Sequence, residues 1–157
     1  MNVENVKIEI DDVIEKWFFM HLFTKDKEVY LANSSLFGND APNILIKTLK
    51  WFATQSVGTK YLRWEDESQS YIWILNKKED EFNIEIWLGL GKLSLIMFYE
   101  GEEVLKDKDK ILFSATTSYY YFVQNVKEAF HTYFNFKEEK NHEYEIDFRL
   151  LDSLKGY

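Results

Sequence analysis

The sequence predicts an α+β fold: a mainly antiparallel sheet of about six to seven strands, with two long helices packed on one face and a short C-terminal helix. Strand-like segments, in which apolar and polar residues alternate, fill most of the first two thirds of the chain. One segment with helical spacing interrupts them, and a second follows them. The order of β-meander, helix, β-meander and helix is typical of an α+β domain.

Three strands are expected in the first meander. Apolar and charged residues alternate along the first of them: Val6, Lys7, Ile8, Glu9, Ile10 and Asp11. Residues 17–23 are apolar at nearly every position, and residues 28–32 return as a third strand after a polar turn. Because both faces of the strand at 17–23 are apolar, either protein covers both of them or the second is an aromatic surface offered to a partner.

The first helix is predicted directly after Asp40. Asp is a favoured N-cap, and Pro42 falls in the first turn, where its missing N–H costs nothing. Apolar residues recur there at helical spacing: Ala41, Leu45, Leu49 and Phe52. Gly58 lies beyond them as a stop signal.

The second meander is expected from five further segments. They are residues 60–64, 71–75, 82–88, 93–99 and a short last strand at 111–113. The charged residues 101–110 are interpreted as a surface connection between the last two.

The last third of the chain contains the clearest helical pattern. Its apolar positions follow one face of a helix: Tyr119, Phe122, Val126, Phe130 and Tyr133. Thr117 or Ser118 is the expected N-cap, and a short terminal helix is expected near residues 148–154. Since no repeat, low-complexity segment or Pro/Gly-rich linker divides the chain, residues 1–157 are predicted to form one domain.

Charge restricts the classes of partner. The 27 acidic residues exceed the 19 lysines and arginines, which gives a net charge of −8. Such a chain repels phosphate backbones and anionic lipid surfaces, so neither nucleic acid nor a membrane is expected as a partner. The same charge accelerates encounter with a basic protein. Arg63 and Arg149 are the only arginines, which leaves little scope for an anion-recognition site.

The absence of cysteine excludes disulfides, thiolate nucleophiles and Cys-based zinc sites. The first residues are polar and acidic, unlike a signal peptide, and no apolar run approaches the roughly 20 residues of a membrane helix. We therefore expect a cytoplasmic protein.

No catalytic motif stands out, and the chain is predicted not to be an enzyme and to hold no cofactor or metal. The sequence around Gly89 and Gly91 lacks the third glycine and the following helix of a phosphate-binding loop. The three histidines, His21, His131 and His142, have no partner at helical metal-ligand spacing. His21 is expected to be in the core or half-buried in its aromatic strand, and the other two to be solvated.

Three short motifs carry a resemblance to known proteins. A helix start containing Ser, Asp and Pro runs over residues 35–42, an acidic hairpin follows Trp64, and Tyr71 and Trp73 form a Tyr-x-Trp segment. In this order and spacing the chain resembles small uncharacterised α+β proteins of bacteria and the small acidic immunity proteins of bacterial toxin systems. Ser68 and Gln69 stand where the group has Pro-Gly. The resemblance implies a protein partner and supplies no catalytic residues.

Acidic turns beside aromatic strands are the best candidates for a partner-binding surface. Aromatic residues make up 28 of the 157, more than a core needs, and aromatic side chains are favoured interface anchors. The predicted partner-binding residues are Glu65, Asp66, Glu67, Tyr71, Trp73 and Trp87.

The resulting hypothesis is a non-enzymatic protein-binding protein, with an immunity protein that neutralises a basic toxin as its most specific form. Two alternatives remain open from the sequence. One is a small-molecule-binding protein with an aromatic-lined pocket between sheet and helices. The other is a homodimer that associates through an aromatic sheet face.

Overall fold

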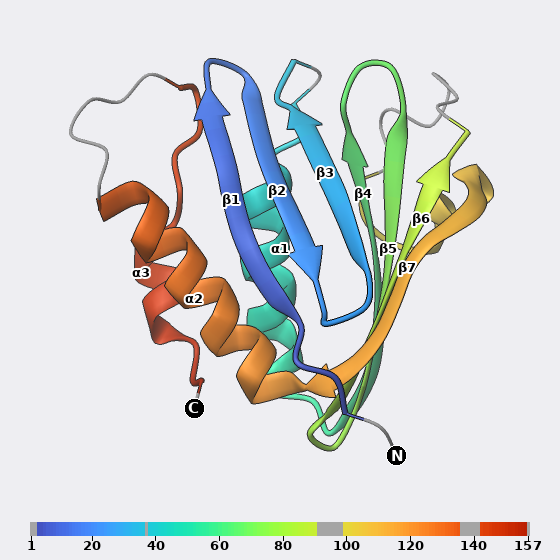
Figure 1. Cartoon of the computed structure of the whole chain (residues 1–157), viewed down its shortest axis with the longest axis vertical. Helices are drawn as coiled ribbons and strands as arrows, with labels where there is room; N and C mark the ends of the chain where they lie inside the picture. Colours follow the sequence, from blue (N-terminus) through green and yellow to red (C-terminus); the bar gives the residue numbers. More distant parts are fainter. Residues whose placement is uncertain (1–2, 37, 91–98, 136–141, 157) are drawn as a thin grey trace.

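The computed structural model describes residues 3–36, 38–90, 99–135 and 142–156. Its elements follow one another along the chain as shown in Figure 1. They are β1 (Lys7–Ile14), β2 (Trp17–Phe23), β3 (Glu28–Ser34), α1 (Ala41–Phe52), β4 (Val57–Glu65), β5 (Ser70–Lys78), β6 (Glu81–Gly89), the 3-10 helix η2 (Glu102–Asp107), β7 (Lys108–Ser118), α2 (Tyr119–Asn135) and α3 (Phe148–Ser153).

The strands form two antiparallel sheets. One contains β1, β2 and β3 in that order, and the other contains β4, β5, β6 and β7 in that order. The α+β class and the antiparallel pairing are therefore confirmed. The prediction of one continuous sheet of six to seven strands was wrong.

Polar side chains at the junction of the two sheets explain the division. The edge of β4 next to β3 bonds to the asparagine side chain before α1: Glu65 N donates to Asn39 Oδ1 at 2.7 Å, and Asn39 Nδ2 donates to Arg63 O at 3.3 Å. Further along this edge, Arg63 N donates to Tyr99 O and Gly101 N donates to Tyr61 O. Since these groups already occupy the edge of β4, β3 has no backbone ladder to join.

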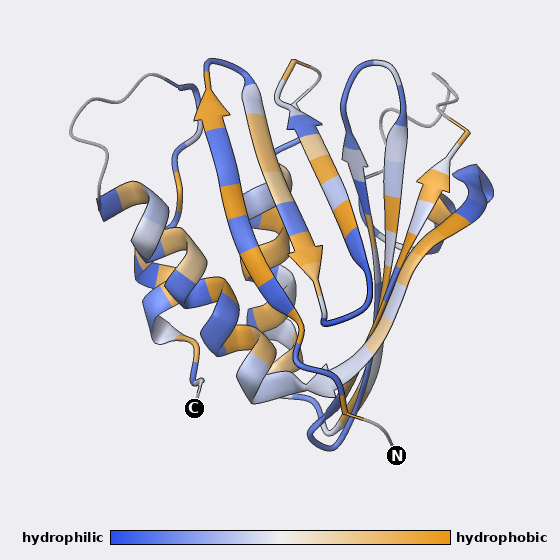
Figure 2. Ribbon diagram, viewed as in Figure 1, coloured by the Kyte–Doolittle hydropathy of each residue, from blue (hydrophilic) through white to orange (hydrophobic). Residues whose placement is uncertain are grey.

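One buried core lies between the sheets and the helices. Phe18 of β2 contacts Trp64 of β4 and Phe130 of α2, with ring centroids 6.0 and 5.9 Å apart. At the other end, Phe52 of α1 lies 5.1 Å from Phe82 of β6 in an edge-to-face arrangement. Both long helices contribute to this core, and the hydropathy colouring of Figure 2 shows the alternation along β1 and β3 that turns one set of residues toward it.

The first helix begins where its sequence signals predicted and ends at Phe52, the last of its predicted apolar positions. Asp40 precedes it and Pro42 lies in its first turn. The Asp40 carboxylate forms no capping bond to the helix backbone; it accepts a hydrogen bond from Asn43 Nδ2 at 2.8 Å. Gly58 lies inside β4, where a Cβ atom would come within 2.7 Å of the Trp51 ring, so its role is close packing and not helix termination.

The segment before the second long helix differs most from expectation. Residues 101–110 were predicted as a solvated connection, but they contain η2, whose Val104 and Asp107 are buried. The short last strand predicted at 111–113 is the long β7, which continues directly into α2. Most of the strand predicted at 93–99 lies outside the described residues.

Over the described part of the chain, none of the helices combines the length and the apolar character that crossing a membrane requires.

Candidate functional site

The first predicted acidic residue, Glu65, belongs to a buried ion-pair group. Its carboxylate lies 2.8 Å from the Arg63 guanidinium, which also lies 3.3 Å from the Asp107 carboxylate of η2. Asp107 accepts a hydrogen bond from the Ser70 hydroxyl as well. Burial raises the pKa of Glu65, and the attraction of Arg63 opposes that rise. Gly89 packs against this group, since a Cβ atom there would overlap Ser70 and Asp107.

The next two acidic residues have separate local roles. Asp66 Oδ1 accepts hydrogen bonds from Ser68 N at 3.0 Å and Gln69 N at 2.6 Å, which holds the turn between β4 and β5. Glu67 adopts a positive φ of 74° and pairs with Lys16 at 3.4 Å. Of the three acidic residues in this turn, only Glu67 is exposed.

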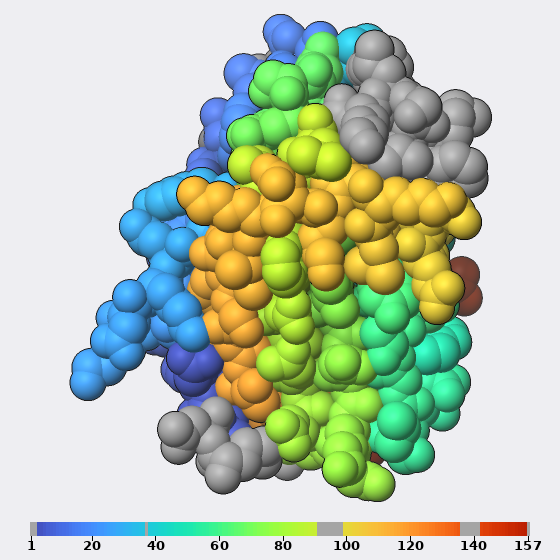
Figure 3. All heavy atoms as spheres, turned by 90° about the vertical axis from the view of Figure 1, so that its right-hand side faces the viewer, coloured from blue at the N-terminus to red at the C-terminus, as the bar shows by residue number. Residues whose placement is uncertain are grey.

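The predicted aromatic anchors divide between core and surface. Trp73 is fully buried and Tyr71 nearly so. Trp87 is half-buried on the outer face of the four-stranded sheet, where Lys108 Nζ lies 4.3 Å from its ring centroid and Glu85 accepts a hydrogen bond from its indole N–H at 2.8 Å. Figure 3 shows that the segment carrying η2, coloured yellow, lies across this outer face. The six predicted residues therefore do not form one exposed surface.

A different surface gathers accessible aromatic side chains. We call it the aromatic face, the outer face of the three-stranded sheet, defined by Trp17, Phe19, His21, Phe23 and Tyr30. Figure 1 shows α1 behind this sheet and no described helix or strand in front of it. Tyr30 is 59% exposed, and the rings stack in two groups, Trp17 with Phe19 and His21 with both Phe23 and Tyr30.

Three carboxylates lie beside the aromatic face, together with the exposed Lys7, which is the ladder partner of Phe23. Glu9 and Asp11 of β1 and Glu28 of β3 are exposed beside it. The Glu28 carboxylate, with smaller contributions from desolvation and from Asp11 and Glu9, raises the pKa of the Tyr30 hydroxyl above its ordinary value. This direction is the signature of a negative electrostatic potential at the surface of the sheet.

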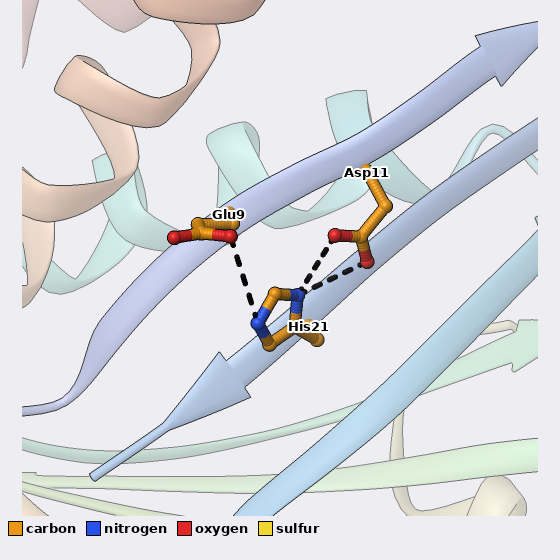
Figure 4. Close-up of side chains that lie close together, drawn as sticks. All are labelled: Glu9, Asp11 and His21. Atoms are coloured by element: carbon orange, nitrogen blue, oxygen red, sulfur yellow. Dashed lines mark hydrogen bonds and ion pairs between the residues drawn. The ribbon is translucent and has the colours of Figure 1, made fainter.

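Three of these side chains meet closely, as Figure 4 shows. His21 Nδ1 lies 2.9 and 3.0 Å from the two oxygens of Asp11, and His21 Nε2 lies 3.7 Å from Glu9 Oε2. The ligand atoms of the three residues lie within 4.8 Å of one another, and in the described part of the chain they make up the one such group of His, Asp and Glu side chains. Their donor types, imidazole and carboxylate, are those that bind divalent transition metals.

The other histidines occupy simpler surroundings. His131 Nε2 of α2 lies 2.5 Å from one carboxylate, that of Asp152 in α3. His142 Nδ1 accepts a hydrogen bond from Tyr144 N at 3.2 Å. Both were predicted to be solvated, and both are half-buried, whereas His21 is buried, in agreement with the core or half-buried position predicted for it.

A surface groove of about 630 Å³ lies between β1 and α2. Charged and polar side chains make up most of its lining, among them Lys7, Glu9, Asn125 and Glu128, and Tyr133 is the one aromatic residue there. This groove differs from the enclosed, aromatic-lined pocket that the small-molecule alternative requires.

The sequence predicted on which faces of their strands Glu9, Asp11 and His21 lie, but not that these three side chains meet. The alternation in β1 places Glu9 and Asp11 on the wet face, and that in β2 places His21 on the face opposite the core. What was missing is the register of the hairpin, which pairs Glu9 with His21, and the β-bulge between Ile10 and Asp12. Counting from the tight turn at Glu15 and Lys16 without the bulge would pair Glu9 with Leu22, so the alternation alone gives the wrong partner.

Comparison of the chain with protein-family models, with curated proteins and with solved structures found no match.

Proposed function

We propose that this chain is a non-enzymatic protein-binding protein and that its aromatic face docks onto a basic protein. The observation that carries the proposal is the accessible row of aromatic side chains on a sheet face with carboxylates beside it. Aromatic side chains supply most of the binding energy in protein interfaces, and complementary charge supplies orientation and on-rate.

Charge selects the partner. The chain has a net charge of −8, and Glu9, Asp11 and Glu28 concentrate part of it beside the aromatic face. A neutral or acidic protein would meet repulsion there, whereas a basic surface would be steered toward it. Glu67, from the predicted acidic turn, pairs with Lys16, whose ammonium lies 5.8 Å from the Trp17 ring centroid, and so offsets the positive charge at that ring.

A basic toxin is the specific partner in this proposal. The resemblance to immunity proteins of toxin systems suggests a toxin as the partner. The carboxylates beside the aromatic face, Glu9, Asp11 and Glu28, supply the negative charge that would attract a basic one. We favour this function over small-molecule binding because the groove between β1 and α2 is a surface groove in which Tyr133 is the one aromatic lining residue among those described. The gene product encoded beside this chain is the first toxin to test by co-expression and protection of the host cells.

Site-directed crosslinking tests the proposed face. A photo-reactive phenylalanine analogue replaces Tyr30, which is 59% exposed on the aromatic face, or Tyr121, which is 54% exposed on α2 and serves as the matched control. After irradiation with the co-expressed basic protein, we expect an adduct from position 30 and none from position 121. Adducts from position 121 alone, or equal adducts from both, would contradict the proposal.

The purified complex provides the second measurement. Tyr30→Ser is expected to weaken binding by about tenfold or more, because a central aromatic anchor is worth more than about 1.4 kcal/mol. Raising the ionic strength is expected to lower the association rate in the parent protein. An association rate that does not respond to salt would remove the basic partner from the proposal.

A further inference from the structure

We propose that His21 and Glu9 bind a divalent transition-metal ion such as Zn²⁺ on the outer face of the three-stranded sheet, with Asp11 as the positioning residue. This inference concerns the isolated chain and does not depend on the proposed protein-binding function, although both involve the same face.

The Asp11 carboxylate fixes which imidazole nitrogen is available. An ionised carboxylate can only accept hydrogen bonds, so His21 Nδ1, at 2.9 and 3.0 Å from its two oxygens, must carry the hydrogen. In the neutral ring, Nε2 then presents its lone pair, and that nitrogen faces Glu9. A carboxylate that holds the distal N–H of a metal-binding histidine is the usual arrangement in protein metal sites.

The gap between His21 Nε2 and Glu9 fits a bridging cation. The two atoms are 3.7 Å apart, too far for a hydrogen bond, and both are electron-pair donors when the imidazole is neutral. Two zinc ligands at about 2.1 Å from the ion and at a tetrahedral angle lie about 3.4 Å apart. The observed separation corresponds to an angle of about 120° at such an ion, so a small side-chain rotation produces ideal geometry.

The sheet holds both ligands in place. Glu9 and His21 are direct partners in the ladder between β1 and β2. The His21 ring stacks against Phe23 on its own strand and against Tyr30 on β3, with centroid distances of 5.0 and 4.8 Å. The imidazole is therefore already ordered, with 11% of the side chain exposed, and loses little entropy on binding. Glu9 is 62% exposed, which leaves a path for the ion and for the waters that complete its coordination.

The local charge also favours a cation. Through the described ranges of the chain, neither Glu9 nor Asp11 forms an ion pair with a lysine or an arginine, and the side chain that both of them contact is the His21 imidazole. Imidazole as a ligand selects Zn²⁺, Ni²⁺ or Co²⁺ over Mg²⁺ and Ca²⁺, which prefer oxygen.

NMR spectroscopy of the untagged full chain tests the site directly. Long-range proton–nitrogen spectra resolve the imidazole nitrogens of all three histidines during titration with Zn²⁺, and with Mg²⁺ as the control metal. We expect Zn²⁺ to shift Nε2 of His21 first, with a single-site titration curve, and Mg²⁺ to leave it unchanged. If the Nε2 resonance of His21 does not respond up to millimolar Zn²⁺, the proposal is overturned.

Matched variants separate the ligands from the positioning residue in calorimetric titrations. His21→Gln is expected to abolish the high-affinity Zn²⁺ event. Asp11→Asn is expected to weaken it by about 10 to 100-fold, the usual effect of losing the carboxylate behind a ligating histidine. His131→Gln is the control, because among the described residues His131 has the carboxylate of Asp152 as its one acidic partner, and it is expected to leave the affinity unchanged. Zn²⁺ binding that survives His21→Gln and disappears in His131→Gln would place the metal elsewhere and refute the assignment.

Discussion

At the residue scale, three consecutive carboxylates with the same sequence signature have three different roles. Glu65 is buried against Arg63, Asp66 accepts the backbone bonds of its turn, and Glu67 is exposed and paired with Lys16. Charge runs are usually solvated, and that expectation holds for one residue of the three. The position of each residue along β4 and its turn determines whether its carboxylate is buried or exposed. Glu65 is buried because it shares the outer face of β4 with Arg63.

The buried Glu65 gives a pH-dependent prediction. Burial raises its pKa in the folded protein above the ordinary value of 4.5, so the folded state holds the proton more tightly than the unfolded state. The stability that Glu65 contributes is therefore fully present below about pH 4.5 and is lost as the pH rises through the folded pKa. Relative to Glu65→Gln, which does not titrate, the parent protein should lose stability across this range. Each tenfold difference in proton affinity accounts for about 1.4 kcal/mol.

Urea unfolding of both proteins at a series of pH values from 4 to 8 measures this difference. Asp107→Asn is the comparison variant, since it removes the negative charge of the other carboxylate that faces Arg63. We expect Asp107→Asn to destabilise the protein at every pH, by about 3 kcal/mol, as is usual when one partner of a buried ion pair is removed. A stability difference between the parent and Glu65→Gln that grows in favour of the parent as the pH rises would be the wrong sign for this account.

At the element scale, the alternation of apolar and polar residues predicted where the strands lie but not that they divide into two sheets. The alternating burial of β1 and the aromatic composition of β2 follow directly from the sequence. The junction between β3 and β4 does not follow from the sequence, because it depends on the side chains of Asn33 and Asn39. Asparagine is usually assigned to strand ends and loops. Both asparagines are fully buried, and Tyr144 from the C-terminal segment donates its hydroxyl to Asn33 Oδ1 at 2.7 Å.

The asparagine junction gives a stability prediction. Asn39→Ala removes the acceptor of Glu65 N and of Asn33 Nδ2, and the donor to Arg63 O. Each buried polar group that loses its partner costs about 1 to 3 kcal/mol, so we expect a loss of about 3 kcal/mol or more in the free energy of unfolding. Chemical denaturation measures it. The exposed Asn5→Ala is the control, expected to stay within about 0.5 kcal/mol of the parent. Equal effects from the two variants would show that the junction does not hold the sheets together.

At the scale of the whole molecule, the two sheets turn their inner faces to one core and differ in what covers their outer faces. The segment with η2 lies across the outer face of the four-stranded sheet and contributes buried Val104 and Asp107. The outer face of the three-stranded sheet has no such described cover and presents the aromatic face. The aromatic surplus of the sequence therefore divides between the core and one accessible surface.

This asymmetry gives a prediction about association. Two copies of a chain with net charge −8 repel each other, and the carboxylates beside the aromatic face bring that repulsion to the contact itself. We expect the isolated protein to be monomeric at low ionic strength, by light scattering over a range of concentrations. A dimer that Tyr30→Ser abolishes would identify the aromatic face as a self-association surface and would replace the basic partner with a second copy of the chain.

The sequence by itself determined the α+β class, the course of β1, β2, β4, β5 and β6, and both long helices, because these depend on alternation between residues two to four positions apart. It also determined which side chains of β1 and β2 share a face. Only the tertiary structure decided that there are two sheets, that Arg63 and Glu65 are buried beneath η2, and that Glu9 meets His21. These features depend on contacts between residues far apart in the chain, such as Arg63 with Asp107, and on the register of a hairpin that a single bulge changes. For that reason the sequence left open whether the second face of β2 is covered, and the packing of the described elements decided that no helix or strand among them covers it.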